Sequence, residues 1–147
     1  MQFMMIVKAT KDSEAGKLPG EKLLAAMGKY NEELMKAGML VDLSGLRPSS
    51  QGARVHFSGG GKVSVTDGPF AETKELIAGY WIIRAKSLAE AIDWARRAPM
   101  LEDGGVEAEI EVRPFFEIED FAPSETIDRA RKLGEELAAQ KAERNPK

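Results

Sequence analysis

The side chains best suited to acid–base chemistry lie between residues 54 and 67. Asp67 opens the run Asp67-Gly68-Pro69-Phe70, and a carboxylate on a rigid loop can act as a general base or accept a ligand hydrogen bond. His56 is the only histidine, the residue type that usually exchanges protons near neutral pH. Asp67 and His56 are the candidate catalytic residues. The structural alternatives are a rigid Asp-Gly turn and a merely exposed histidine.

Further polar or aromatic side chains are candidate ligand contacts: Arg54, Ser64, Thr66, Glu72, Lys74 and Tyr80. Arg54 or Lys74 would stabilise developing negative charge, and Tyr80 would line a pocket for a planar ligand. The alternatives are a solvated charge run at 72–75 and core packing for Tyr80. No metal or cofactor is expected, because one histidine and no cysteine make a poor zinc site.

Composition narrows the class of protein. The chain has 147 residues, 43% hydrophobic and 31% charged, with a net charge of −3. This is typical of an ordinary globular domain, and the acidic balance argues against direct nucleic-acid binding. The apolar run at 2–9 is too short to span a membrane and lacks signal-peptide flanks. We therefore expect a cytoplasmic protein without a membrane segment.

Hydrophobic periodicity predicts the elements that position these residues. Strands are expected at 2–9, 39–46, 77–85 and 106–113, and helices at 23–35, from 88 to before Pro99, and from 124 onward. A capping box, Ser87-Leu88-Ala89-Glu90, opens the second of these helices. The 10–20 segment is expected to be a loop, and a helical turn is expected at 71–74 within the 67–76 loop.

An inserted hairpin is expected at 53–66 around Gly59-Gly60-Gly61. Because side chains alternate along strands, its two faces should differ in character. One face would carry Val55, Phe57, Val63 and Val65. The other would carry Arg54, His56, Ser64 and Thr66.

Without the hairpin, the order is β-α-β-β-α-β, so the predicted class is α+β with a ferredoxin-like arrangement. We expect a domain at 1–121 and a charged helical tail at 122–147. Two helices can cover only one face of the sheet, yet the strands at 3–7 and 80–83 are apolar on both faces. The economical cover is a second copy under two-fold symmetry, which predicts a homodimer.

The run Asp67-Gly68-Pro69-Phe70-Ala71-Glu72-Thr73-Lys74-Glu75 closely resembles the signature of the DGPF branch of the YCII-related proteins. Further matches are Ala37-Gly38-Met39-Leu40, Leu76-Ile77-Ala78-Gly79-Tyr80, Ala91-Ile92-Asp93-Trp94-Ala95 with Pro99, and Val112-Arg113-Pro114-Phe115. The resemblance covers residues 2–116 and implies a dimeric α+β barrel. It also implies a link to extracytoplasmic-function sigma factors, and for some relatives dehydrochlorinase or isomerase-like roles on aromatic compounds.

One departure concerns the mechanism that the resemblance implies. Relatives outside this branch carry a His on the first helix and an Asp before the Pro that ends the second, proposed as an acid–base pair. Here the first helix has no His, and Ala98 precedes Pro99, so that pair is not carried over.

The hypotheses are therefore a small-molecule-binding dimer with an accessory or regulatory role, or an enzyme that transfers protons on a small cyclic or aromatic metabolite. A third is partner binding through the charged C-terminal helix.

Overall fold

The computed structural model describes residues 1–144. Close contacts divide the chain into a first unit, Met1–Pro114, and a second unit that begins at Phe115.

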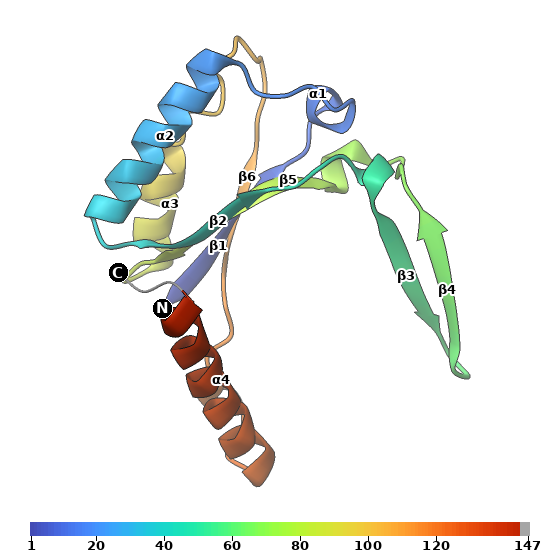
Figure 1. The fold of residues 1–147 in the computed structure, drawn as a ribbon, viewed down its shortest axis with the longest axis vertical. Coiled ribbons are helices and arrows are strands. Elements are labelled where there is room, and N and C mark those ends of the chain that lie inside the picture. The colour runs from blue at the N-terminus through green and yellow to red at the C-terminus, as the bar shows by residue number, and fades with distance from the viewer. Residues whose placement is uncertain (145–147) are drawn as a thin grey trace. The chain divides into compact units, whose positions relative to one another are not determined.

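The first unit contains an antiparallel four-stranded sheet with two long helices on one face (Figure 1). Its strands are β1 (Gln2–Lys8), β2 (Leu40–Gly45), β5 (Ile77–Arg84) and β6 (Ile110–Pro114), and β3 (Ala53–Ser58) and β4 (Lys62–Asp67) form a separate hairpin. Its helices are α1 (Lys11–Glu14), α2 (Glu21–Lys36) and α3 (Leu88–Arg96), with short 3₁₀ turns η1 (Ser49–Gln51) and η2 (Thr73–Glu75).

The strand order is β2-β5-β1-β6, with every pairing antiparallel. Without the hairpin, this order and the α2 and α3 crossovers give the ferredoxin-like β-α-β-β-α-β arrangement. The predicted α+β class is therefore confirmed. The homodimer remains a prediction.

The core lies between the sheet and its two helices. Phe3 and Met5 of β1 and Ile83 of β5 are fully buried there, with Leu34 of α2. Helix α2 ends at Lys36, where Ala37 is the cap and Gly38 takes a positive φ of 71° that favours glycine.

Residues that alternate with this core line the opposite side of the sheet, which we call the open face: Met4, Ile6, Tyr80 and Ile82. Met4 pairs with Ile82, and Ile6 pairs with Tyr80. Neither α2 nor α3 covers this side (Figure 1).

The hairpin has the two faces that alternation predicts, and the structure supplies its register. His56 pairs with Ser64 and Phe57 with Val63, so apolar and polar side chains occupy opposite faces. Every residue of β3 and β4 is exposed. In Figure 1 the hairpin extends from the sheet on the side away from α2 and α3.

The strand predicted at 106–113 begins later than expected. β6 starts at Ile110, and Val106 is 98% exposed. The reason is the length of its neighbour: β1 ends at Lys8, whose amide donates to the Glu109 carbonyl. Residues before Glu109 have no strand to pair with, so the alternation at 106–109 forms no ladder.

Other local predictions were wrong in detail. The 10–20 loop contains α1, which Thr10 and Ser13 stabilise with a capping box. The turn expected at 71–74 is the 3₁₀ turn Thr73–Glu75. At α3, Ser87 caps the Glu90 amide, but the Glu90 carboxylate accepts from the Lys86 amide rather than completing the expected box.

The second unit contains the 3₁₀ turn η3 (Ile118–Asp120) and helix α4 (Glu125–Arg144). The Ser124 hydroxyl accepts from the Ile127 amide, which matches the predicted start of the helix. Arg131 forms an ion pair with Glu119 at 3.3 Å. No helix within residues 1–144 has the length and apolar character needed to cross a membrane.

Candidate functional site

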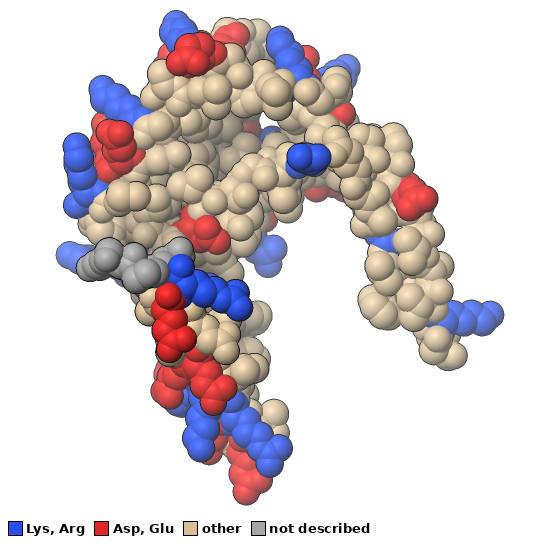
Figure 2. All heavy atoms as spheres, viewed as in Figure 1, with Lys and Arg blue, Asp and Glu red and all other residues tan. Residues whose placement is uncertain are grey.

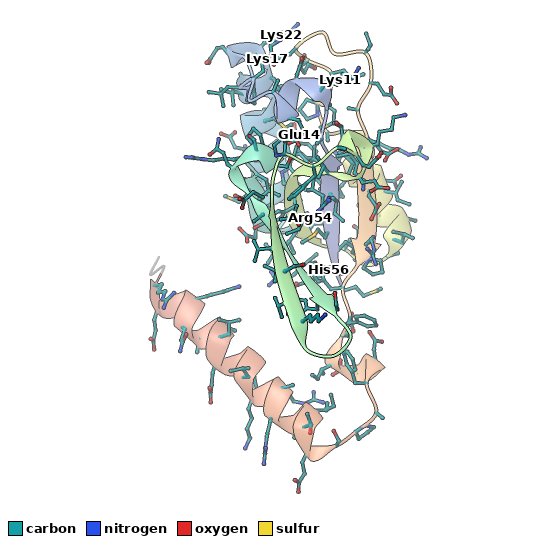
Figure 3. All side chains as sticks on the ribbon, turned by 90° about the vertical axis from the view of Figure 1, so that its right-hand side faces the viewer. Lys11, Glu14, Lys17, Lys22, Arg54 and His56 are labelled. Atoms are coloured by element: carbon teal, nitrogen blue, oxygen red, sulfur yellow. The ribbon has the colours of Figure 1, made fainter. Side chains whose placement is uncertain are left out.

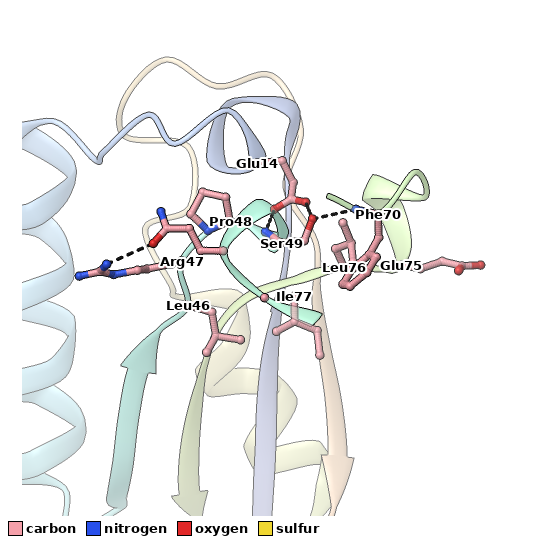
Figure 4. Close-up of a pocket in the computed structure, with 11 residues that line it drawn as sticks. Glu14, Leu46, Arg47, Pro48, Ser49, Phe70, Glu75, Leu76 and Ile77 are labelled. Carbon is pink, nitrogen blue, oxygen red and sulfur yellow. Dashed lines mark hydrogen bonds between the residues drawn. The ribbon is translucent and has the colours of Figure 1, made fainter. Parts of the chain in front are cut away.

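An open recess of about 570 Å³ lies beside the Asp67-Gly68-Pro69-Phe70 loop (Figure 4). It forms where the end of α1, the segment after β2 and the segment leading into β5 meet. Its walls combine charged, polar and apolar residues, as small-molecule sites do. The lining residues are Glu14, Leu46, Arg47, Pro48, Ser49, Gln51, Gly52, Phe70, Glu75, Leu76 and Ile77.

A chain of hydrogen bonds joins residues of the recess wall (Figure 4). The Phe70 amide donates to the Ser49 hydroxyl at 3.1 Å, and that hydroxyl donates to Glu14 Oε1. The Ser49 amide donates to Glu14 Oε2 at 2.9 Å. Glu14 thereby joins α1 to the loop after β4, and its half-buried carboxylate lies within the recess wall.

The loop itself packs closely on the segment that holds Ser49. The Gly68 amide donates to the Gly52 carbonyl at 3.0 Å. A Cβ at Gly68 would lie 1.7 Å from the Ser49 carbonyl oxygen, so only glycine fits. The Gly68–Pro69 peptide bond is cis.

The predicted catalytic residues lie outside this recess. Asp67 is the exposed last residue of β4, paired through the backbone with Ala53. His56 is exposed on the hairpin, opposite Ser64. Figure 3 shows His56 farther along the hairpin than Arg54.

The predicted ligand contacts are spread over the first unit. Arg54 is paired with Thr66 on the hairpin, and its guanidinium lies over the Phe70 ring, 3.8 Å from the ring centre. Glu72 immediately precedes η2 and Lys74 lies within it; both are exposed, and neither lines the recess. Tyr80 lies on the open face, where its hydroxyl is 3.5 Å from Asp42 Oδ2.

Sequence reasoning missed Glu14 and Ser49. They lie 35 positions apart, and neither belongs to a recognisable motif. The one available signal was Thr10 with Ser13, a pair that caps a helix N-terminus. A prediction of helix α1 from this pair would have identified Glu14, its last residue, as a candidate.

A second open recess, of about 970 Å³, lies between α3, β6 and the segment that joins them. Its walls are mainly apolar, with Ile92 and Met100 among them. Lys22 and Glu102 form a long ion pair of 4.0 Å beside it. The charged residues that line it are all exposed, namely Lys22, Arg96, Glu102 and Glu109. Because Glu14 in the first recess is half-buried, we regard the first recess as the better candidate.

Within residues 1–144, no group of three histidine, aspartate or glutamate side chains is placed to hold a metal ion.

Tyr30 is a buried tyrosine with a shifted pKa. Burial raises the pKa of Tyr30 to about 12; Arg97 opposes this shift and Glu33 adds to it. The Tyr30 hydroxyl donates to the Trp94 carbonyl at 2.7 Å, so its role is in the core.

Comparison with known proteins gives a family. The family model described as the YCII-related domain matches residues 1–116. An uncharacterised protein of Rhizobium meliloti (strain 1021) is 37% identical over 76 residues, or 52% of this chain. The match spans 60% of that relative, which is less than two thirds of its length.

Among solved structures, the chain is similar to a 5-chloro-2-hydroxyhydroquinone dehydrochlorinase from Burkholderia phenoliruptrix AC1100, in complex with 2,5-dihydroxybenzoquinone. The identity is 16% and the TM-score 0.44, over 79% of this chain and 94% of that one. Similarity at this level supports no inference about activity.

Proposed function

The chain belongs to the YCII-related family, and we propose that it binds a small organic molecule in the recess beside the Asp67-Gly68-Pro69-Phe70 loop. The observation that carries this proposal is the half-buried Glu14 carboxylate in a recess whose mixed walls include apolar Leu76 and Ile77. A carboxylate held there by other parts of the fold is positioned before any ligand arrives.

The Glu14 carboxylate sets the chemistry of the ligand. Its two oxygens offer about four lone-pair sites, and Ser49 fills one on each oxygen. The remaining sites accept hydrogen bonds only, so the ligand must supply a donor such as a hydroxyl or an amine. Leu76 and Ile77 favour an apolar body around that donor.

A matched set of probes tests this proposal. Phenol and benzylamine carry a donor on an apolar ring, whereas toluene and anisole have a similar body without one. Titrated against the labelled protein, phenol or benzylamine should shift the amide NMR signals of Ser49 and Phe70, and toluene and anisole should shift them much less.

Glu14→Gln should weaken the binding of the donor probes, because the amide loses the charge and offers fewer acceptor sites. The control is Glu32→Gln, the same change at an exposed residue of α2 that does not line the recess. If all four probes bind equally, or none shifts the Ser49 and Phe70 signals, the proposal is wrong.

The same carboxylate supports a second candidate function, proton transfer on a small cyclic or aromatic metabolite. A base next to a bound apolar ring could remove a proton from carbon. Glu14 occupies that position better than Asp67 or His56, which do not line the recess. Incubating small cyclic ketones in D₂O with the protein should then exchange C–H for C–D, and Glu14→Gln should abolish it. Exchange unchanged by Glu14→Gln would reject this role.

The proposed assembly is a homodimer through the open face. Met4, Tyr80 and Ile82 are only half-buried there, and a second copy is the economical cover. Light scattering at micromolar concentration should give twice the chain mass; a monomer mass would overturn the dimer but not the ligand recess. The accessory or sigma-factor-associated regulatory role rests on the resemblance to the DGPF branch alone.

A further inference from the structure

We propose that the outer edge of β6 and the second recess together form a docking groove for an extended segment of another protein, one that alternates apolar with basic residues. The segment adds a strand to the sheet beside β6 and places its apolar side chains in the recess. The groove shares no residue with the proposed ligand recess, and it lies at the edge of the sheet rather than on the open face.

The outer edge of β6 has backbone groups without partners. β6 ends the strand order β2-β5-β1-β6, so it pairs only with β1. The Lys8 amide donates to the Glu109 carbonyl, and positions that bond across an antiparallel pair alternate along each strand. The amides of Ile110 and Val112 therefore point away from β1, and within residues 1–144 they meet no backbone acceptor there. Such an edge is a template for a further strand.

The segment before β6 has the pattern of a strand but no neighbour. Val106 and Ala108 alternate with Glu107 and Glu109, yet β1 ends before it can pair with them. Val106 is 98% exposed. A strand added along the outer edge pairs with this segment as well as with β6, so the unused strand pattern gains the neighbour that β1 does not provide.

The second recess supplies room for the side chains of the added strand. The side chains of Ile110 and Val112 pack toward the core and line this recess. Leu88 and Ile92 of α3 and Leu101 line it too, with exposed fractions of 45%, 36% and 49%. When a peptide joins a sheet edge, main-chain hydrogen bonds give affinity, and pockets for alternate side chains give specificity.

Charge at this edge favours a basic occupant. The carboxylates of Glu107 and Glu109 form no ion pair within residues 1–144. Basic residues at alternate positions of the added strand complement them, because opposed residues of neighbouring strands interact across the pair. A second copy paired edge to edge would instead bring Glu107, Glu109 and Glu111 of both chains into one row, where like charges repel.

The two edges of the sheet differ in their surroundings. Figure 2 shows the side of the first unit where α2 and the other edge strand, β2, lie, and charged side chains of both signs follow α2 there. β6 instead borders a mainly apolar recess. A groove with an apolar wall therefore accompanies β6, and β6 is the docking edge.

The first test uses a capped heptapeptide of alternating lysine and valine. Added to the labelled full chain, it should slow hydrogen exchange of the Ile110 and Val112 amides about tenfold or more, because they gain acceptors. The Glu111 amide faces β1 already and serves as the reference. A glutamate–valine peptide and a lysine–serine peptide should protect these amides much less, since the first is repelled and the second leaves the recess unfilled.

Two methylated forms of the lysine–valine peptide test strand addition itself. Alternate amides of an added strand face the edge that it joins. Methylation of all valine amides or of all lysine amides therefore blocks bonding in one of the two peptides only. One should bind like the parent peptide, and the other at least about tenfold more weakly. Equal binding of both would show that the peptide does not add as a strand.

Glu109→Lys should weaken binding of the lysine–valine peptide about fivefold or more and strengthen binding of the glutamate–valine peptide. The control is Glu72→Lys, the same change at an exposed residue that does not line the second recess, and it should alter neither affinity. Affinities unchanged in Glu109→Lys, or no protection of the Ile110 and Val112 amides, would overturn the inference. So would amides that are already protected in the protein alone, because the edge would then be occupied without the peptide.

Discussion

At Gly68 a side chain of any size would meet the backbone of the segment at 49–50. Gly68→Ala should lower the free energy of unfolding by about 3 kcal/mol or more, because the obstacle is backbone rather than a flexible side chain. Urea unfolding followed by circular dichroism measures the change. Gly59→Ala is the matched control, since its Cβ would meet no atom within 4 Å. Equal effects of the two substitutions would contradict the close packing.

Tyr30 should make the stability of the first unit fall at alkaline pH. It is 4% exposed, and burial raises its pKa from 10.0 to about 12. Between these values the folded state keeps a proton that the unfolded state has lost, so stability decreases as pH rises from about 10 and stops decreasing near 12. The total decrease in the free energy of unfolding is about 3 kcal/mol, because each unit of pKa shift corresponds to roughly 1.4 kcal/mol.

Urea unfolding at pH values between 9 and 12 measures this dependence. Tyr30→Phe removes the phenol and should flatten the profile in that range, whereas Tyr80→Phe, on the open face, should leave it in place. An identical alkaline slope in wild type and Tyr30→Phe would show that other groups cause it.

At the scale of elements, Ser49 connects α1 to the loop after β4. Ser49→Ala removes the hydroxyl that accepts from the Phe70 amide and donates to Glu14. We expect a loss of about 1–3 kcal/mol, since two polar groups lose a partner, and faster hydrogen exchange at the Phe70 amide. Ser50→Ala, at an exposed neighbour, should change neither; an unchanged Phe70 exchange rate in Ser49→Ala would reject the connection.

The elements that sequence could predict are those set by local pattern. The two faces of the β3–β4 hairpin follow from alternation on either side of Gly59-Gly60-Gly61, whereas its register is known only from the structure. The start of β6 does not follow from alternation, because it depends on where β1 ends more than 100 positions earlier. The alternation of 106–109 satisfies the strand pattern without a neighbour to pair with.

The candidate site was likewise only partly predictable from the sequence. The Asp67-Gly68-Pro69-Phe70 loop was identifiable from its residues, and it does border the recess through Phe70. Glu14 was not, since its partner Ser49 is distant in sequence and the contact arises only when α1 packs near η1. Local signals identified the loop, but not the carboxylate that supports it.

At the scale of the whole molecule, the first unit should fold without the second. The core cluster of the first unit draws its buried residues from Phe3 to Ala91 and none from the second unit. We therefore propose that a chain ending at residue 121 keeps the fold, as the domain boundary placed there implies. Its urea midpoint, measured by circular dichroism, should match that of the full chain within error; an unfolded or strongly destabilised product would show that the tail supports the core.

Tyr30 contacts the rings of both Trp81 and Trp94, with ring centres 5.5 Å and 6.4 Å away. The sequence contains only two tryptophans, so the intrinsic fluorescence of this protein comes from one small volume where α2, α3 and β5 meet. The β3–β4 hairpin and helix α4 contribute no tryptophan emission. A change in emission therefore reports on the helix–sheet layer alone, and the chain carries its own optical probe for separating loss of the core from rearrangement elsewhere.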